Sequence, residues 1–150
     1  MSRLTIGQVL GSGASGVFRI PGRLSRARLG MLAHLHGLQV FDVDCAPAGD
    51  KRGLLRELAR ALRFPDYFGY NWDALEDCLT DLGWLDARGT VLTLAAADRL
   101  AGRAPRELGV ALDILEDTAA YWAAEGRQFV TLVQAGARRA LAPLPEIRTA

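Results

Sequence analysis

Four short apolar runs, each bounded by turn residues, predict β-strands along the chain. These runs are residues 16–20, 38–44, 90–95 and 128–133. Between them, apolar residues recur at three- and four-residue spacing, which predicts amphipathic helices. The expected helices are residues 24–35, a second helix that contains Leu54 to Leu62 and is capped at its start by Asp50, the helix of residues 72–82, and residues 105–124. Strands that alternate with helices of this length are typical of an α/β domain with a largely parallel sheet.

A glycine pattern near the start of the chain, Gly11-x-Gly13-x-x-Gly16, matches phosphate-binding loops of kinases and of dinucleotide-binding domains. A dinucleotide site needs a helix directly after the glycines, whereas this sequence continues into a predicted strand and Pro21. The chain also lacks the HRD and DFG motifs of a kinase. We therefore interpret the glycine-rich segment as a flexible loop.

Composition favours one globular domain. The chain has 150 residues, of which 50% are hydrophobic and 23% charged, and no apolar run approaches the roughly 20 residues of a membrane span. Because the N-terminus lacks the apolar core of a secretory signal, we expect a cytoplasmic location and no membrane contact. Cys45 and Cys78 have no metal-binding spacing and are interpreted as buried free thiols. The pair His34 and His36 lacks further ligands nearby, so no metal or cofactor is expected.

Charge is distributed unevenly. Residues 1–41 contain five arginines, two histidines and no acid, whereas the formal net charge of the whole chain is only +1. The arginines are interleaved with apolar residues, which favours a solvated helix face over direct contact with nucleic acid. Residues 64–87 show the opposite bias, with six acidic residues and no basic one.

The acidic residues of this segment gather on one side of the expected helix that follows Asn71, its predicted N-cap. At about 100° per residue, one face carries Asp73, Glu76, Asp77, Thr80 and Asp81, and the opposite face carries Leu75, Cys78 and Leu79. Attraction to the helix dipole accounts for Asp73, but acids one turn apart repel each other.

Three explanations of this acidic face remain open on residue chemistry alone. It is a solvated surface, or a pair of carboxylates on a metal ion, or a binding face for a cationic partner. The enzymatic explanation needs Asp73 and Asp77 to act with a nearby base or cation, and the segment supplies none. A binding face accounts for more of the pattern, because Tyr67 and Trp72 lie at its margin.

The segment that contains this face, residues 64–79, reads FPDYFGYNWDALEDCL. This string resembles the signature of the barstar family, intracellular inhibitors of barnase-like ribonucleases. The residues in register with the signature are Pro65, Tyr67, Gly69, Asn71, Asp73, Ala74, Leu75, Asp77, Cys78 and Leu79. The looser likeness, in the order strand, helix, helix, strand, helix, strand, extends from about residue 38 to residue 133. It implies a barstar-like α/β fold, with a short three- to four-stranded parallel sheet packed with helices.

The resemblance also implies a function without catalysis: an acidic helix occludes the active site of a secreted guanyl-type ribonuclease and mimics RNA phosphates. The implied partner-binding residues are Tyr67, Asn71, Trp72, Asp73, Glu76, Asp77 and Thr80. Asp77 would be the central phosphate mimic and Asp73 its neighbour. No catalytic residue, metal or cofactor is implied, and the chain is expected to be a monomer before it forms a complex.

Two departures from the barstar pattern concern the identity of the partner. Glu76 stands where barstar has an aromatic residue, and Tyr121 stands where barstar has an acid on its later helix. Glu116 or Asp117 could take the place of that acid. The alternative function is therefore an immunity or scaffold protein of the same fold that binds a different basic toxin or protein.

Three parts of the chain are expected on this basis. Residues 1–37 form an N-terminal extension that adds a strand and a helix, residues 38–135 form the barstar-like domain, and residues 136–150 form an irregular tail.

Overall fold

A computed structural model describes residues 4–81, 88–136, 141 and 143–149 of the chain. At its centre lies a four-stranded sheet in the order β1-β4-β3-β2, and each neighbouring pair of strands is parallel. The strands are β1 (Gly16–Ile20), β2 (Leu38–Asp44), β3 (Gly89–Ala95) and β4 (Gln128–Gln134). The fold is thus the α/β, barstar-like arrangement that the sequence predicts.

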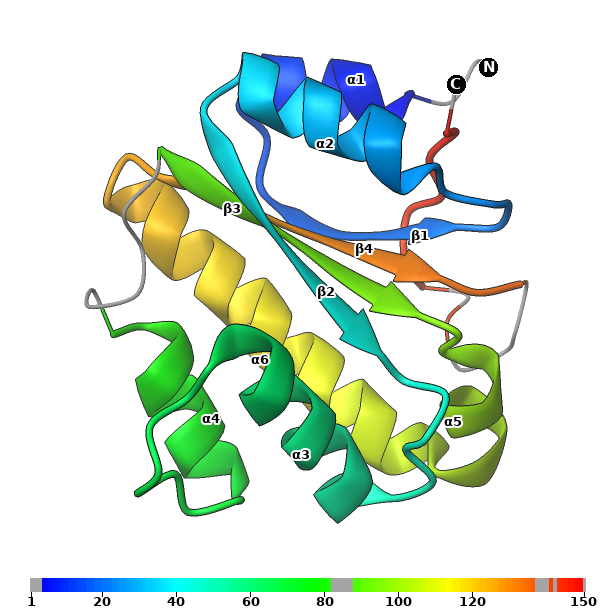
Figure 1. The fold of residues 1–150 in the computed structure, drawn as a ribbon, viewed down its shortest axis with the longest axis vertical. Helices are drawn as coiled ribbons and strands as arrows, with labels where there is room; N and C mark the ends of the chain where they lie inside the picture. Colours follow the sequence, from blue (N-terminus) through cyan, green and yellow to red (C-terminus); the bar gives the residue numbers. More distant parts are fainter. Residues whose placement is uncertain (1–3, 82–87, 137–140, 142, 150) are drawn as a thin grey trace.

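Helices cover both faces of this sheet (Figure 1). Helices α1 and α2 lie on one face, and α3, α4 and α6 lie on the other, where the larger hydrophobic core forms. The helices are α1 (Ile6–Ser12), α2 (Arg26–Leu35), α3 (Lys51–Leu62), α4 (Trp72–Leu79), α5 (Asp98–Arg103) and α6 (Pro105–Ala124). Among the described residues, no helix combines the length and the apolarity that a membrane-spanning segment requires.

The interpretation of the glycine-rich segment as a flexible loop is wrong. Its first glycine belongs to α1, which begins with a capping box: the Thr5 hydroxyl accepts a hydrogen bond from the Gln8 backbone N–H, and the Gln8 amide oxygen accepts one from the Thr5 N–H. Gly13 ends the helix with a φ of 78°, and Gly16 begins β1. The Thr-x-x-Gln spacing is a known sign of a helix start and predicts α1 once it is noticed.

The described part of the N-terminal extension is integrated into the sheet. β1 pairs with β4 over its whole length, and α2 carries the chain across one face to β2 at the opposite edge (Figure 1). Apolar residues of that face, among them Val91 and Val130, form a second core with α1 and α2. The C-terminal tail is attached to β1. The Arg19 backbone N–H donates to the Pro145 carbonyl, and the Arg19 guanidinium pairs with Glu146.

Both cysteines are free thiols, and Cys45 is fully buried just after β2. Burial raises the pKa of the Cys45 thiol to about 12, and the nearby carboxylates of Asp44 and Glu57 add to the shift. The thiol therefore remains neutral in the folded protein at pH values where an exposed cysteine ionises, near about 8.5.

The pH dependence of stability should report this buried thiol. The folded pKa lies above the unfolded one, so the stabilisation from the neutral thiol is complete below about pH 8.5 and is lost as the pH rises towards 12. The contribution falls by at most about 1.4 kcal/mol per pH unit. Urea unfolding of Cys45→Ala should therefore show a shallower loss of stability between about pH 8.5 and 10.5 than the parent protein. Parallel losses in the two proteins would contradict this expectation.

Candidate functional site

Local interactions fix the start of the acidic helix α4. The Asn71 side chain accepts a hydrogen bond from the Ala74 backbone N–H at 2.8 Å, as its predicted capping role requires. The amide nitrogen of the same side chain donates to the Gly69 carbonyl at 3.4 Å. Tyr70 lies between these residues with a φ of 50°, in the left-handed region that a residue with a side chain rarely adopts. Asn71 therefore joins the loop to the first turn of α4.

The two faces of α4 divide as the sequence predicts. Leu75 and Leu79 are fully buried, whereas Asp73, Glu76 and Asp77 are exposed. Cys78 is partly buried, and Thr80 donates its hydroxyl hydrogen to the Glu76 carbonyl at 2.9 Å. In the described part of the chain, the carboxylates of Asp73, Glu76 and Asp77 form no ion pair. The exposed face of α4 therefore carries three negative charges that the described residues do not neutralise.

A buried hydrogen bond holds the end of α4 against α6. The indole N–H of Trp122 donates to the Leu79 carbonyl at 2.9 Å, and the Trp122 side chain is fully buried. Carbonyl groups in the last turn of a helix have no partner within the helix, so this bond satisfies a group that would otherwise be buried without one. The helix that carries the acidic face is thus attached to α6.

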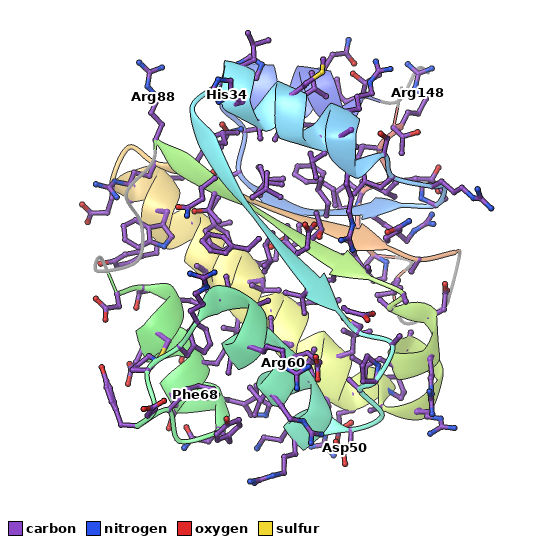
Figure 2. All side chains as sticks on the ribbon, in the orientation of Figure 1. His34, Asp50, Arg60, Phe68, Arg88 and Arg148 are labelled. Atoms are coloured by element: carbon purple, nitrogen blue, oxygen red, sulfur yellow. The ribbon has the colours of Figure 1, made fainter. Side chains whose placement is uncertain are left out.

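Asp77 borders two surface depressions on opposite sides. The first has a volume of about 230 Å³ and is lined by Tyr67, Phe68, Gly69, Ala74, Asp77, Cys78 and Asp81. Figure 2 shows Phe68 in the loop that precedes α4. The second has a volume of about 410 Å³ and is lined by Glu76, Asp77, Thr80, Asp117, Thr118 and Tyr121. Asp77 therefore has the central position among the predicted site residues, while Asp73 and Trp72 line neither of these two depressions.

The wall of the first depression also holds a thiol. Partial burial raises the pKa of Cys78, and the negative charges of Asp81 and Asp77 raise it further. The sulfur therefore contributes an uncharged surface beside two carboxylates, and the depression combines apolar, aromatic and anionic walls.

Two cations that the sequence prediction missed lie against the aromatic residues at the start of α4. The Lys51 ammonium is 5.1 Å from the centre of the Trp72 ring, and the Arg52 guanidinium is 5.4 Å from the centre of the Tyr70 ring. Trp72 is accordingly half-buried, whereas Tyr67 is 75% exposed. Nothing in the local sequence predicts these contacts, because α3 supplies both cations from about twenty residues away. They mark a positively charged edge of the acidic face.

The acids of α6 lie in different surroundings. Asp117 and Tyr121 line the second depression together with Glu76. Glu116 instead accepts a hydrogen bond from the Val17 backbone N–H at 2.9 Å, at the edge of the sheet. Of the two acids considered as replacements for the family's acid, only Asp117 therefore adjoins α4 across a shared depression. Among the described residues, no three His, Cys, Asp or Glu side chains come together in a way that could hold a metal ion.

The fold and this surface define an α/β protein that displays an anionic helix beside an aromatic loop. The family model described as "Barstar (barnase inhibitor)" matches residues 38–134, and the chain belongs to the barstar family. No curated protein matches the chain.

Solved structures show a likeness of fold. The ORC2 protein of Aeropyrum pernix in its ADP form superposes with a TM-score of 0.56 at 19% sequence identity, covering 89% of this chain and 39% of that one. The same protein in its ADPNP-ADP complexes superposes with a TM-score of 0.54, with the same identity and coverage. The chain thus spans about two fifths of the ORC2 protein. At this identity the likeness concerns the fold alone.

The hydrogen bond between Trp122 and Leu79 can be tested by substitution. Trp122→Phe keeps an aromatic ring but leaves the Leu79 carbonyl buried without its donor, which should cost about 1–3 kcal/mol. Loss of ring volume adds to that figure. Urea unfolding should report the loss, and hydrogen exchange should accelerate more in α4 than in α2. Phe129→Leu, in the same core but without this bond, provides the control. Equal acceleration in α2 and α4 of Trp122→Phe would show that the bond does not hold α4.

Proposed function

We propose that the protein inhibits a barnase-like, guanyl-type ribonuclease by occluding its active site. The observation that carries this proposal is the exposure of Asp73, Glu76 and Asp77, without ion pairs in the described structure, on a helix inside the family match. Carboxylates displayed in this way can replace RNA phosphates against the arginine, lysine and histidine side chains of a ribonuclease. An inhibitor of a secreted ribonuclease acts inside the producing cell, so we propose a cytoplasmic location.

The geometry supports a division of labour on this surface. Asp77 is the central phosphate mimic, because it can meet a cation that enters either depression. Tyr67 forms an exposed wall of the first depression, and Glu76 and Thr80 line the second. Asn71 caps the start of α4 and joins it to the preceding loop, and Trp72, with Lys51 over its ring, borders the contact. Asp73 adds charge in the first turn.

This mechanism uses no chemical step by the inhibitor. Binding requires no cofactor and no catalytic residue, because occlusion depends only on shape and charge. The helix is held at its start by Asn71 and at its end by Trp122. A surface that is ordered before binding loses less conformational entropy when the complex forms, which favours affinity.

A second candidate function keeps the fold and changes the partner to a different basic toxin or protein. The observation that favours it is the second depression, where Glu76 and Asp117 extend the anionic surface from α4 onto α6 beside Tyr121. Glu76 and Tyr121 are the positions at which the chain departs from the barstar pattern. Contacts with Glu76 and Tyr121 would favour a partner that has a cation opposite this depression over a typical barnase-like enzyme.

Substitution of Asp77 tests the proposed centre of the interface. Asp77→Ala should weaken binding to the cognate ribonuclease by about ten- to hundredfold, because it removes charge-assisted hydrogen bonds worth about 1.5–3 kcal/mol. Asp113→Ala is the matched control, since Asp113 is an exposed acid on α6 outside both depressions. Titration calorimetry against a panel of barnase-like ribonucleases provides the measurement. Binding to none of them would favour the second candidate function, and equal effects of the two substitutions would remove Asp77 from the interface.

The salt dependence of association tests the electrostatic part of the proposal. Raising ionic strength from about 0.01 M to 0.15 M shortens the screening length from about 30 Å to 8 Å. The association rate measured by stopped flow should therefore fall by about tenfold, while the dissociation rate changes less. The double variant Glu76→Gln, Asp77→Asn should lose much of this dependence, and Asp113→Asn should keep most of it. A rate that is insensitive to salt would contradict steering by this face.

A further inference from the structure

A pocket on the opposite side of the sheet lies outside the barstar-family match. It has a volume of about 210 Å³ and is enclosed by α1, the start of α2 and the C-terminal segment. Its lining residues are Ile6, Arg23, Leu24, Ser25, Arg28, Leu29, Leu32 and Thr149. All but the last come from the N-terminal extension, to which the family resemblance assigns no role.

The pocket combines an apolar floor with a cationic rim. Ile6 and Leu29 are almost completely buried beneath it, at 1% and 2% exposure. Arg23 and Arg28 are exposed at its rim, and neither guanidinium forms an ion pair in the described part of the chain. The start of α2 is capped by the Ser25 hydroxyl, which accepts from the Arg28 backbone N–H. The guanidinium groups of Arg23 and Arg28 supply the positive charge of the pocket.

Among the described residues, no acidic side chain of the surrounding elements offsets this charge. The sequence contains no Asp or Glu from residue 1 to residue 41, so α1, α2 and the turn before α2 are free of carboxylates. Glu146 of the C-terminal segment pairs with Arg19. Figure 2 shows Arg148 on the C-terminal segment, beside the layer formed by α1 and α2. The pocket thus faces solvent through a rim that favours an anion.

We propose that this pocket binds a carboxylate carried on a short apolar group. Arginine guanidinium groups match the planar geometry of a carboxylate and can bind it through paired hydrogen bonds. The apolar floor can accept the attached carbon chain. A pocket of about 210 Å³ can hold the few carbon atoms of a short chain. A short aliphatic acid has this chemistry, and so does the C-terminal residue of a peptide that ends in an apolar side chain.

Backbone amide shifts of the isotopically labelled full chain test the proposal with pentanoate as the probe. Pentanoate should cause saturable shifts at Leu29, Leu32 and Thr149 at roughly millimolar concentration. Pentanol, which has the same chain but no charge, should bind at least about tenfold more weakly. Inorganic phosphate, which has charge but no carbon chain, should produce weak amide shifts near the arginines and none at Leu29 of the apolar floor. Pentanol that binds as tightly as pentanoate would overturn the anionic assignment.

Three arginine substitutions supply matched variants. Arg23→Gln and Arg28→Gln together should weaken pentanoate binding by about tenfold, because they remove both cationic hydrogen-bond donors from the rim. Arg26→Gln should change it by less than about twofold, since Arg26 is exposed on the same helix but does not line the pocket. An equal effect of Arg26→Gln would show a general charge effect and overturn the site. Asp77→Ala should leave pentanoate binding unchanged, which separates this proposal from the ribonuclease interface.

A peptide pair distinguishes the two sources of the ligand. The probe is the peptide Gly-Gly-Gly-Val with a free carboxylate, and its amidated form is the control. Tighter binding of the free peptide than of pentanoate, with loss on amidation, would identify a peptide terminus as the ligand class. Weaker binding of the peptide than of pentanoate would identify a free aliphatic acid. If neither pentanoate nor the free peptide produces saturable shifts, the proposal is wrong.

Discussion

The hydrogen bond from the Trp122 indole to the Leu79 carbonyl lets α4 attach to the core by one face while its other face stays exposed. The helix has eight residues, too few to be stable alone, so packing must hold it in place. Its outer face is occupied by carboxylates, and only Leu75 and Leu79 are fully buried on the inner side. The bond from α6 satisfies the last turn within the core and leaves the outer face available. The exposure of the acids on α4 depends on this one-sided attachment.

Such an attachment explains why charge repulsion within α4 is tolerated. Asp73 repels Glu76 and Asp77, which lie three and four residues further along the helix, at a cost of a few tenths of a kcal/mol per pair. Attraction of Asp73 to the helix dipole offsets part of this cost. The described structure supplies no cation to neutralise the three acids, and the Lys51 and Arg52 side chains pack over aromatic rings instead. A cationic partner would therefore relieve a repulsion that the isolated protein retains.

Local patterns in the sequence predicted the four strands and the four longer helices, whereas contacts between distant residues decided the surroundings of the acids on α6. The alternation in residues 38–44 and the rotation of about 100° per residue in α4 depend only on neighbours. Both α1 and α5 were missed, the first because its glycines suggested a loop and the second because six residues are too few for periodicity. The Glu116 side chain accepts a hydrogen bond from the backbone N–H of Val17, 99 residues away in the sequence. No spacing rule relates such positions, so the sequence could not separate Glu116 from Asp117.

The layer formed by α1 and α2 meets the same requirement as α4, the burial of apolar surface, on the other face of the sheet. Val91, Val130 and Leu132 are completely buried on that face, where α1 and α2 cover them. A parallel sheet needs cover on both faces, because its strands are apolar on both sides. That requirement accounts for Leu29 and Ala33 on the inner side of α2 but not for the arginines at its start. A helix could cover this face of the sheet whatever charge its solvent-facing side carries. Arg23 and Arg28, which form no ion pair with the described residues, therefore call for an explanation beyond folding.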